Sequence, residues 1–149
     1  MDALNAPEPI VDDPYNLERF VRAQNPVFDQ VRAELRRGAK ERHWIWFIFP
    51  QIKGLGYSPT SLRYAISSMD EAEAYLKHPI LGPRLRECTE LVVLVDGLSI
   101  QDIFGYPDYL KFHSCMTLFA QVKSESEVFK DALKKYFGGK FDGSTLERL

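Results

Sequence analysis

Residues 43–56 read HWIWFIFPQIKGLG and contain both tryptophans of this 149-residue chain. Six large apolar residues, 44–49, run without a break into Pro50 and then into a turn that contains Gly54 and Gly56. Propensity alone favours a strand, and an unbroken apolar run has no periodicity that would decide. We predict a helix for 44–49, because the rest of the chain offers almost no strand with which a lone strand could pair. A helix that is apolar on every side has to lie at the centre of the fold.

The bulk composition is that of an ordinary globular protein, with 45% apolar and 27% charged residues. A net charge of −2 gives no overall attraction to nucleic acid or to anionic membranes. No apolar run reaches the ~20 residues that a bilayer requires. Cys88 and Cys115 sit among apolar residues and favour reduced, buried thiols, although a disulfide between them stays open. We predict a cytoplasmic protein with no cofactor, no nucleic-acid partner and no membrane partner; the sequence does not fix an oligomeric state.

Two parts of the chain differ in composition. Residues 1–15 are predicted as a flexible acidic tail, because they combine prolines and acidic residues without a basic start or an apolar run. Residues 16–149 are predicted as a single helical domain, with helix starts at the capping-box patterns of 68–71 and 124–127. We expect a mainly α fold, a compact multi-helix orthogonal bundle in which 44–49 is the central aromatic-rich helix.

The glycine-bearing turn after Pro50 is the first candidate for a ligand site. Glycines let a backbone approach a ligand closely, and free N–H groups can bind an anion, to which Lys53 could add charge. A tight turn that needs positive φ at its glycines explains the same residues without a ligand. On a helix, residues two apart such as Trp44 and Trp46 point in nearly opposite directions. One tryptophan is therefore expected in the core, while the other could line a pocket and stack on a flat ligand.

A polar strip is the second candidate. Within a helix expected from Asp108 to about Val122, every third residue is polar: Asp108, Lys111, Ser114 and Thr117. Buried polar groups need partners, so this strip faces either water or a site. Lys111 and Ser114 could form a base and a nucleophile. A solvated strip or a structural polar network is the alternative.

These two candidates combine into one hypothesis, in which a nucleotide-like or other polar anionic small molecule binds between the turn and the strip. Trp46 would form one wall, and the Gln51 amide would fix the orientation of the ligand by hydrogen bonds. Lys53, Arg63 or Lys111 would pair with its anionic group. The predicted ligand-binding residues are Trp46, Gln51, Lys53, Gly54, Arg63, Asp108, Lys111 and Ser114. Ser114 and Asp108 would be the first residues to test for catalysis. The alternative hypothesis is a protein-interaction or structural module without chemistry.

The three histidines, His43, His78 and His113, lack metal-ligand spacing, so no metal site is predicted. His78 precedes Pro79 and is expected to hydrogen-bond carbonyl groups in the last turn of a helix. The basic residues between Arg32 and Arg42 are interrupted by acidic ones and indicate a solvated face rather than a nucleic-acid site.

Three ordered blocks carry a family resemblance: HWIWFIFPQ with GLG in 43–56, YLKHPILGPRL in 75–85, and FGYPDYLK with SCMTLF in 104–119. From about Asn16 onward they resemble the bacterial family catalogued as domain of unknown function 1810, whose name implies no established activity. Some members carry the label calpastatin, but an inhibitor of that kind would be long and disordered, unlike this short aromatic-rich chain. Where the family usually has an acidic residue after the Pro-Asp pair, this chain has Tyr109. A role for two adjacent carboxylates is therefore not expected there.

Overall fold

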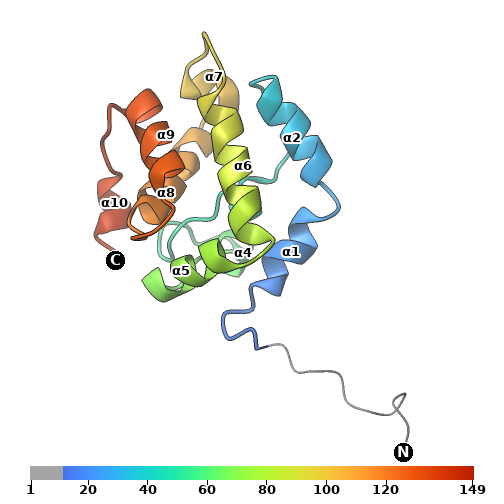
Figure 1. Ribbon diagram of the computed structural model, residues 1–149, viewed down its shortest axis with the longest axis vertical. Coiled ribbons are helices and arrows are strands. Elements are labelled where there is room, and N and C mark those ends of the chain that lie inside the picture. Colours follow the sequence, from blue (N-terminus) through green and yellow to red (C-terminus); the bar gives the residue numbers. More distant parts are fainter. Residues whose placement is uncertain (1–11) are drawn as a thin grey trace, which may run out of the picture.

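The computed structural model describes residues 12–149, and within them ten helices surround one apolar core (Figure 1). In chain order these are α1 (Glu18–Gln24), α2 (Phe28–Arg36), α3 (Ile45–Ile48), α4 (Pro59–Arg63), α5 (Met69–Lys77), α6 (Leu81–Val93), α7 (Ile100–Phe104), α8 (Asp108–Ala120), α9 (Glu127–Phe137) and α10 (Gly143–Leu146). The predicted mainly α fold is confirmed. Residues 1–11, most of the predicted flexible tail, lie outside the described residues. Just after them, the Asp13 carboxylate accepts the backbone N–H groups of Leu17 and Glu18 at the start of α1.

Helix α8 is the element on which most of the others pack. It contacts α3, α5, α7, α9 and α10, and Figure 1 shows α9 lying across it. Its side chains at Phe112, Cys115, Met116 and Phe119 are fully buried. Since α8 also carries the polar strip, its remaining polar positions decide where a site can form.

The aromatic stretch does form a central helix, but one that is only a single turn long. α3 ends at Ile48, and Phe49 leaves the helical conformation at φ −123° and ψ 72°. The cause is Pro50, because a proline disfavours the helical conformation of the residue before it. Phe49 is buried and packs edge-on against Phe112 of α8, with ring centroids 5.0 Å apart. The central position is as predicted, and the helix is one residue shorter at each end than the predicted 44–49, with Trp44 and Phe49 as its caps.

After Pro50 the chain pairs with a distant segment through one parallel bridge between Ile52 and Ile66. The N–H of Ile66 donates to the carbonyl of Gln51 at 2.9 Å. Because the backbone of Ile66 is held in this bridge, α4 stops at Arg63 and leaves Leu62 57% exposed. The spacing of Leu62, Ala65 and Ile66 would suit one buried face of a longer helix, but the helix ends before Ala65.

Arg19 of α1 fastens this bridged region. Its guanidinium donates to the carbonyl groups of Arg63 and Ala65 and forms an ion pair with Glu71 at 2.9 Å. The Glu71 carboxylate also accepts the N–H of Ser67 at 2.9 Å. Charge-assisted bonds of this kind are the stronger ones in proteins. One arginine therefore joins α1, the end of α4 and the start of α5.

The predicted helix caps have mixed outcomes. Ser68 caps α5 by accepting the N–H of Glu71, but the Glu71 carboxylate binds Arg19 and Ser67 instead of completing a capping box. The capping box predicted at 124–127 is wrong, since α9 begins after Ser126 without a side-chain cap bond. The prediction for His78 is confirmed: His78 ends α5, and its backbone N–H donates to the last-turn carbonyl groups of Ala74 and Tyr75. Its Nδ1 accepts the N–H groups of Ile80 and Leu81 at the start of α6, because the chain turns sharply there into the next helix.

Residues 12–149 contain neither a candidate membrane-spanning helix nor a candidate metal site. No helix among them combines the length and the apolar character needed to cross a bilayer. Nor do three or more histidine, cysteine, aspartate or glutamate side chains in this range converge where a metal ion could be held.

A buried carboxylate ties α2 to the aromatic stretch. Glu34 is fully buried, and its Oε1 accepts the N–H groups of Glu41 and Arg42 and the indole N–H of Trp44, the last at 3.0 Å. The Arg42 guanidinium lies 2.9 Å from Oε2. Burial raises the pKa of Glu34, but these four hydrogen bonds outweigh burial and lower the pKa from 4.5 to about 2. The ionised form is thus the one that the fold stabilises.

We predict that Glu34→Gln lowers the free energy of unfolding at pH 7 by about 3 kcal/mol, since each unit of pKa shift is worth ~1.4 kcal/mol. A depressed pKa gives stability that is present above the unfolded value of 4.5 and is lost as the pH falls toward 2. Urea denaturation of the wild type should therefore show falling stability between these pH values, and the variant a weaker dependence. Glu41→Gln is the matched control, because that exposed carboxylate pairs with Arg37 at the surface and should cost about 0.5 kcal/mol or less. Equal losses in the two variants would contradict the prediction.

Both cysteines are free thiols with fully buried side chains. Burial raises the pKa of Cys88 to about 12 and holds that of Cys115 well above its usual range. A thiol has to ionise before it attacks a disulfide reagent. We predict that neither thiol reacts with Ellman's reagent at pH 8 in the folded protein, and that both react in denaturant. Rapid reaction of one equivalent in the native protein would show that a thiol reaches solvent.

Candidate functional site

A pocket of about 470 Å³ opens between the turn after Pro50, α8 and the segment that leads into α10. Its size falls within the range of ~300–1,000 Å³ that is typical of small-molecule sites. Four of the predicted ligand-binding residues line it: Trp46, Gln51, Lys111 and Ser114. The pocket thus brings together the turn and the polar strip, which are some sixty residues apart in the chain.

The two tryptophans divide as their spacing predicts. Trp44 is 1% exposed and lies in the core, whereas Trp46 is half-buried and forms a wall of the pocket. The Trp46 indole N–H donates to the Ser61 hydroxyl oxygen at 3.2 Å. The Ser61 hydroxyl oxygen also accepts a hydrogen bond from the hydroxyl of Ser58, the residue that caps α4. The cap of a short helix therefore fixes the orientation of the indole ring.

Gly56 is required by the close packing at this wall. A Cβ atom at this position would lie 2.6 Å from the Ser61 hydroxyl oxygen and 4.0 Å from the Gln51 amide nitrogen. The first distance is too short for any side chain, so a substitution would displace the hydroxyl that holds Trp46. Gly56 thus allows the backbone to approach Ser61 closely, whereas the close approach to a ligand that the sequence suggested for this turn stays a prediction.

Lys111 supplies the cation of the pocket. Its ammonium group lies 5.6 Å from the centroid of the Trp46 ring, a cation–π distance. Among residues 12–149 no carboxylate lies within ion-pair distance of it. The lysine side chain is half-buried, so its charge is placed beside the cavity rather than in open solvent.

The hydroxyl of Ser114 is used in hydrogen bonds that hold neighbouring segments together. Its hydroxyl lies 3.1 Å from the carbonyl oxygen of Leu110 and 3.2 Å from Oδ2 of Asp142, and donates to these acceptors. The Asp142 Oδ2 also receives the hydroxyl of Thr145 at 2.6 Å, and the Asp142 N–H donates to Thr117 at 2.8 Å. No hydrogen bond joins Ser114 to Lys111 in the described part of the chain, so the two do not form a base–nucleophile pair here. The strip anchors the segment before α10.

Asp142 is a pocket residue that was not predicted. It caps α10 through Oδ2, which receives three donors, whereas no described residue donates to Oδ1. The signal for the cap is the run Asp142-Gly143-Ser144-Thr145, which is typical of a helix start. Its place beside α8 depends on the contact with Thr117, which local sequence does not reveal.

The other predicted residues lie elsewhere. Asp108 pairs with Lys40 at 2.6 Å, because the 5% exposed Lys40 side chain reaches the start of α8. Arg63 and Lys53 line two other depressions, both of which also include Arg19. Gly54, at φ +101°, faces Arg148, and a Cβ there would lie 2.9 Å from the guanidinium nitrogen. A single pocket that contains the whole predicted set is therefore not formed.

The comparisons with known proteins agree on one relationship. A family model described as "Protein of unknown function (DUF1810)" matches residues 14–149. The chain is similar to the conserved hypothetical protein Rv1873 of Mycobacterium tuberculosis, known from a crystal structure, with 55% identity and a TM-score of 0.91. That match covers 92% of this chain and 98% of the mycobacterial chain. Among curated proteins no match is found. The chain belongs to the DUF1810 family of proteins of unknown function.

Proposed function

We propose that the pocket beside Trp46 binds a small polar molecule that carries a negative charge, such as a nucleotide. One observation carries this proposal: a lysine without an ion-pair partner in the described chain lies against an oriented indole, inside a cavity of ligand size. A cation in a partly enclosed cavity attracts an anion more strongly than the same cation in water. The ammonium group of Lys111 therefore favours a negatively charged group beside it, while the carboxylate of Asp142 favours a donor on another part of the ligand.

The remaining walls suit a ligand with both flat and polar parts. Trp46 offers apolar ring surface, and contact between an aromatic side chain and a base is worth ~1–3 kcal/mol. The Gln51 amide can donate and accept, and the unoccupied Oδ1 of Asp142 can accept an N–H or O–H of the ligand. We assign anion pairing to Lys111, contact with the flat part to Trp46, and orientation to Gln51 and Asp142.

The proposal concerns binding and assigns no reaction. Ser114, the nucleophile considered from the sequence, donates its hydroxyl within the α8–α10 network, and Asp108 is paired with Lys40 outside the pocket. A cytoplasmic location is part of the proposal. It rests on the two buried, unpaired thiols, because reduced cysteines are typical of that compartment.

A second candidate function has its own support. Tyr57 is 84% and Leu110 44% exposed, and both belong to the lining of the same pocket. Exposed aromatic and aliphatic side chains around a hollow are typical of protein-interaction sites. In this alternative the hollow would receive a side chain of a partner protein, and small anions would have no effect on stability.

We predict that a nucleoside mono- or diphosphate raises the melting temperature of the wild type in a thermal-shift screen. A ligand present at 100 times its dissociation constant adds ~2.7 kcal/mol to the free energy of unfolding. Lys111→Gln should weaken binding about tenfold, since it removes a charge-assisted contact. Lys53→Gln is the matched control, because that lysine is exposed and lies outside the pocket. A panel of nucleotides and anionic metabolites without any shift would favour the interaction module, and equal weakening in both variants would remove the assignment to Lys111.

We also predict that ligand binding quenches the fluorescence of Trp46 selectively. Trp46 lines the pocket and Trp44 is buried beside Glu34, so only the first should respond to a ligand. Trp46→Phe should retain the emission of Trp44 and lose the quenching. If the quenching persists in Trp46→Phe, the ligand binds at another place.

A further inference from the structure

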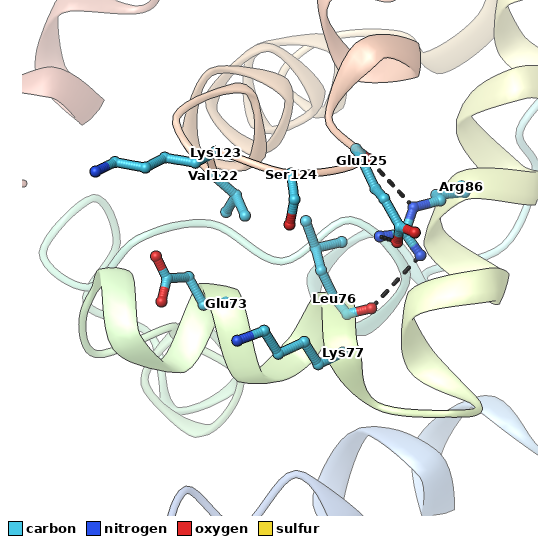
Figure 2. Close-up of a pocket in the computed structure, with 8 residues that line it drawn as sticks. All are labelled: Glu73, Leu76, Lys77, Arg86, Val122, Lys123, Ser124 and Glu125. Atoms are coloured by element: carbon cyan, nitrogen blue, oxygen red, sulfur yellow. Dashed lines mark hydrogen bonds and ion pairs between the residues drawn. The ribbon is translucent and has the colours of Figure 1, made fainter.

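A second, smaller pocket of about 210 Å³ lies on a different part of the surface, between α5, α6 and the segment that joins α8 to α9 (Figure 2). Its apolar floor is formed by Leu76 and Val122, which are 4% and 5% exposed. It shares no lining residue with the pocket beside Trp46. The volume is below the ~300–1,000 Å³ of ordinary small-molecule sites, so only a compact ligand would fit.

Arg86 links the segments that surround this small pocket. Its Nε donates to the carbonyl of Glu125 at 3.2 Å, and its Nη2 pairs with the Glu125 carboxylate at 2.9 Å. Its Nη1 lies 3.5 Å from the carbonyl of Leu76, as the dashed lines of Figure 2 show. The arginine thus joins all three elements around the cavity. A guanidinium has five N–H groups, so two remain without a partner in the described chain.

The ends of α5 and α6 approach so closely that Gly82 is required between them. A Cβ atom at Gly82 would lie 2.1 Å from the Leu76 carbonyl oxygen and 3.1 Å from Nη1 of Arg86. Any other residue would force apart the carbonyl and the guanidinium that frame the cavity. The frame is therefore set by tight backbone packing and not by mobile side chains alone.

Two further donors reach the same space from opposite sides. In Figure 2 the Ser124 hydroxyl points toward α5, while the Lys77 side chain extends along α5 below it. Both residues are exposed, and neither side chain has a hydrogen-bond or ion-pair partner among residues 12–149. The Lys123 side chain extends outward at the rim. Glu73 is the one acidic lining residue besides the paired Glu125. With that pair set aside, Lys77 and Lys123 outweigh Glu73 by one positive charge.

From this arrangement we infer that the small pocket is a binding site for a tetrahedral oxyanion, either free phosphate or the phosphoryl group of a small metabolite. Lys77 supplies a charged donor, Arg86 supplies the two N–H groups that its pair with Glu125 and its bonds to carbonyl groups leave over, and Ser124 supplies a neutral donor. Charged donors that converge from several elements give the strongest hydrogen bonds to phosphate oxygens. The inference is independent of the proposed function, because it uses other residues on another surface.

The test is a titration of the ¹⁵N-labelled protein with inorganic phosphate, followed by NMR at constant ionic strength adjusted with chloride. The amide signals of residues 76–77 and 122–125 should shift saturably. Lys77→Gln should raise the dissociation constant about fivefold, the effect expected from one nearby charge. Glu73→Gln should lower it, because removal of a negative charge strengthens anion binding. Lys134→Gln is the matched control, since Lys134 is exposed on α9 and lines neither pocket.

A parallel titration with glycerol 3-phosphate distinguishes the two sources of the oxyanion. If both compounds bind, the site accepts phosphoryl groups of metabolites, and if phosphate alone binds, the site is specific for the free ion. The spectra of each variant also show whether it is folded. No saturable shift at these amides by about 20 mM phosphate, or an unchanged constant in Lys77→Gln, would overturn the inference. Shifts confined to Trp46 and Lys111 would overturn it as well and would place the anion in the larger pocket.

Discussion

The fold depends on burying an apolar run, residues 44–49, that has no polar side with which to face water. Burial of such residues is the main driving force of folding, but their backbone and indole groups still need hydrogen-bond partners. Because Pro50 limits the helix to one turn, these groups find hydrogen-bond partners in other segments. The Glu34 carboxylate accepts the indole N–H of Trp44, and the Ile52–Ile66 bridge pairs backbone groups beyond the proline. The buried carboxylate stays ionised because its hydrogen bonds outweigh the cost of burial.

The pocket beside Trp46 follows from the same constraint. At the single turn of α3, Trp44 points into the core, whereas Trp46 lies at the edge of the core and contacts Lys111 of α8. An indole at a margin keeps a polar N–H that needs an acceptor, and Ser61 provides it. The Ser61 hydroxyl thereby orients the indole ring. Preorganisation of this kind would reduce the entropy lost when the proposed ligand binds.

The sequence predicted what depends on local pattern and failed where distant contacts decide. The helical class, the central place of 44–49 and the opposed tryptophans follow from composition and spacing, and they are found in the structure. Asp108 and Lys111 are neighbours in the polar strip of α8. Nevertheless Asp108 forms an ion pair with Lys40, which is distant in the sequence, and so lies outside the pocket that Lys111 lines. Periodicity gives the direction in which a side chain leaves its helix, but not the partner that it meets.

Asp142 shows how one residue can link the pocket to the stability of the C-terminal segment. One of its oxygens caps α10 and receives Ser114, while its backbone N–H is held by Thr117 of α8. A ligand that bonded to the other oxygen would bind only when this segment is docked, because the segment carries Asp142 into the pocket. By thermodynamic linkage, such a ligand stabilises the docked segment by the same free energy with which docking favours binding. The members of the polar strip of α8 thus differ in what they contact: Thr117 and Ser114 bond to Asp142, whereas Lys111 has no ion-pair partner among the described residues and is the member to which the proposed ligand would bind.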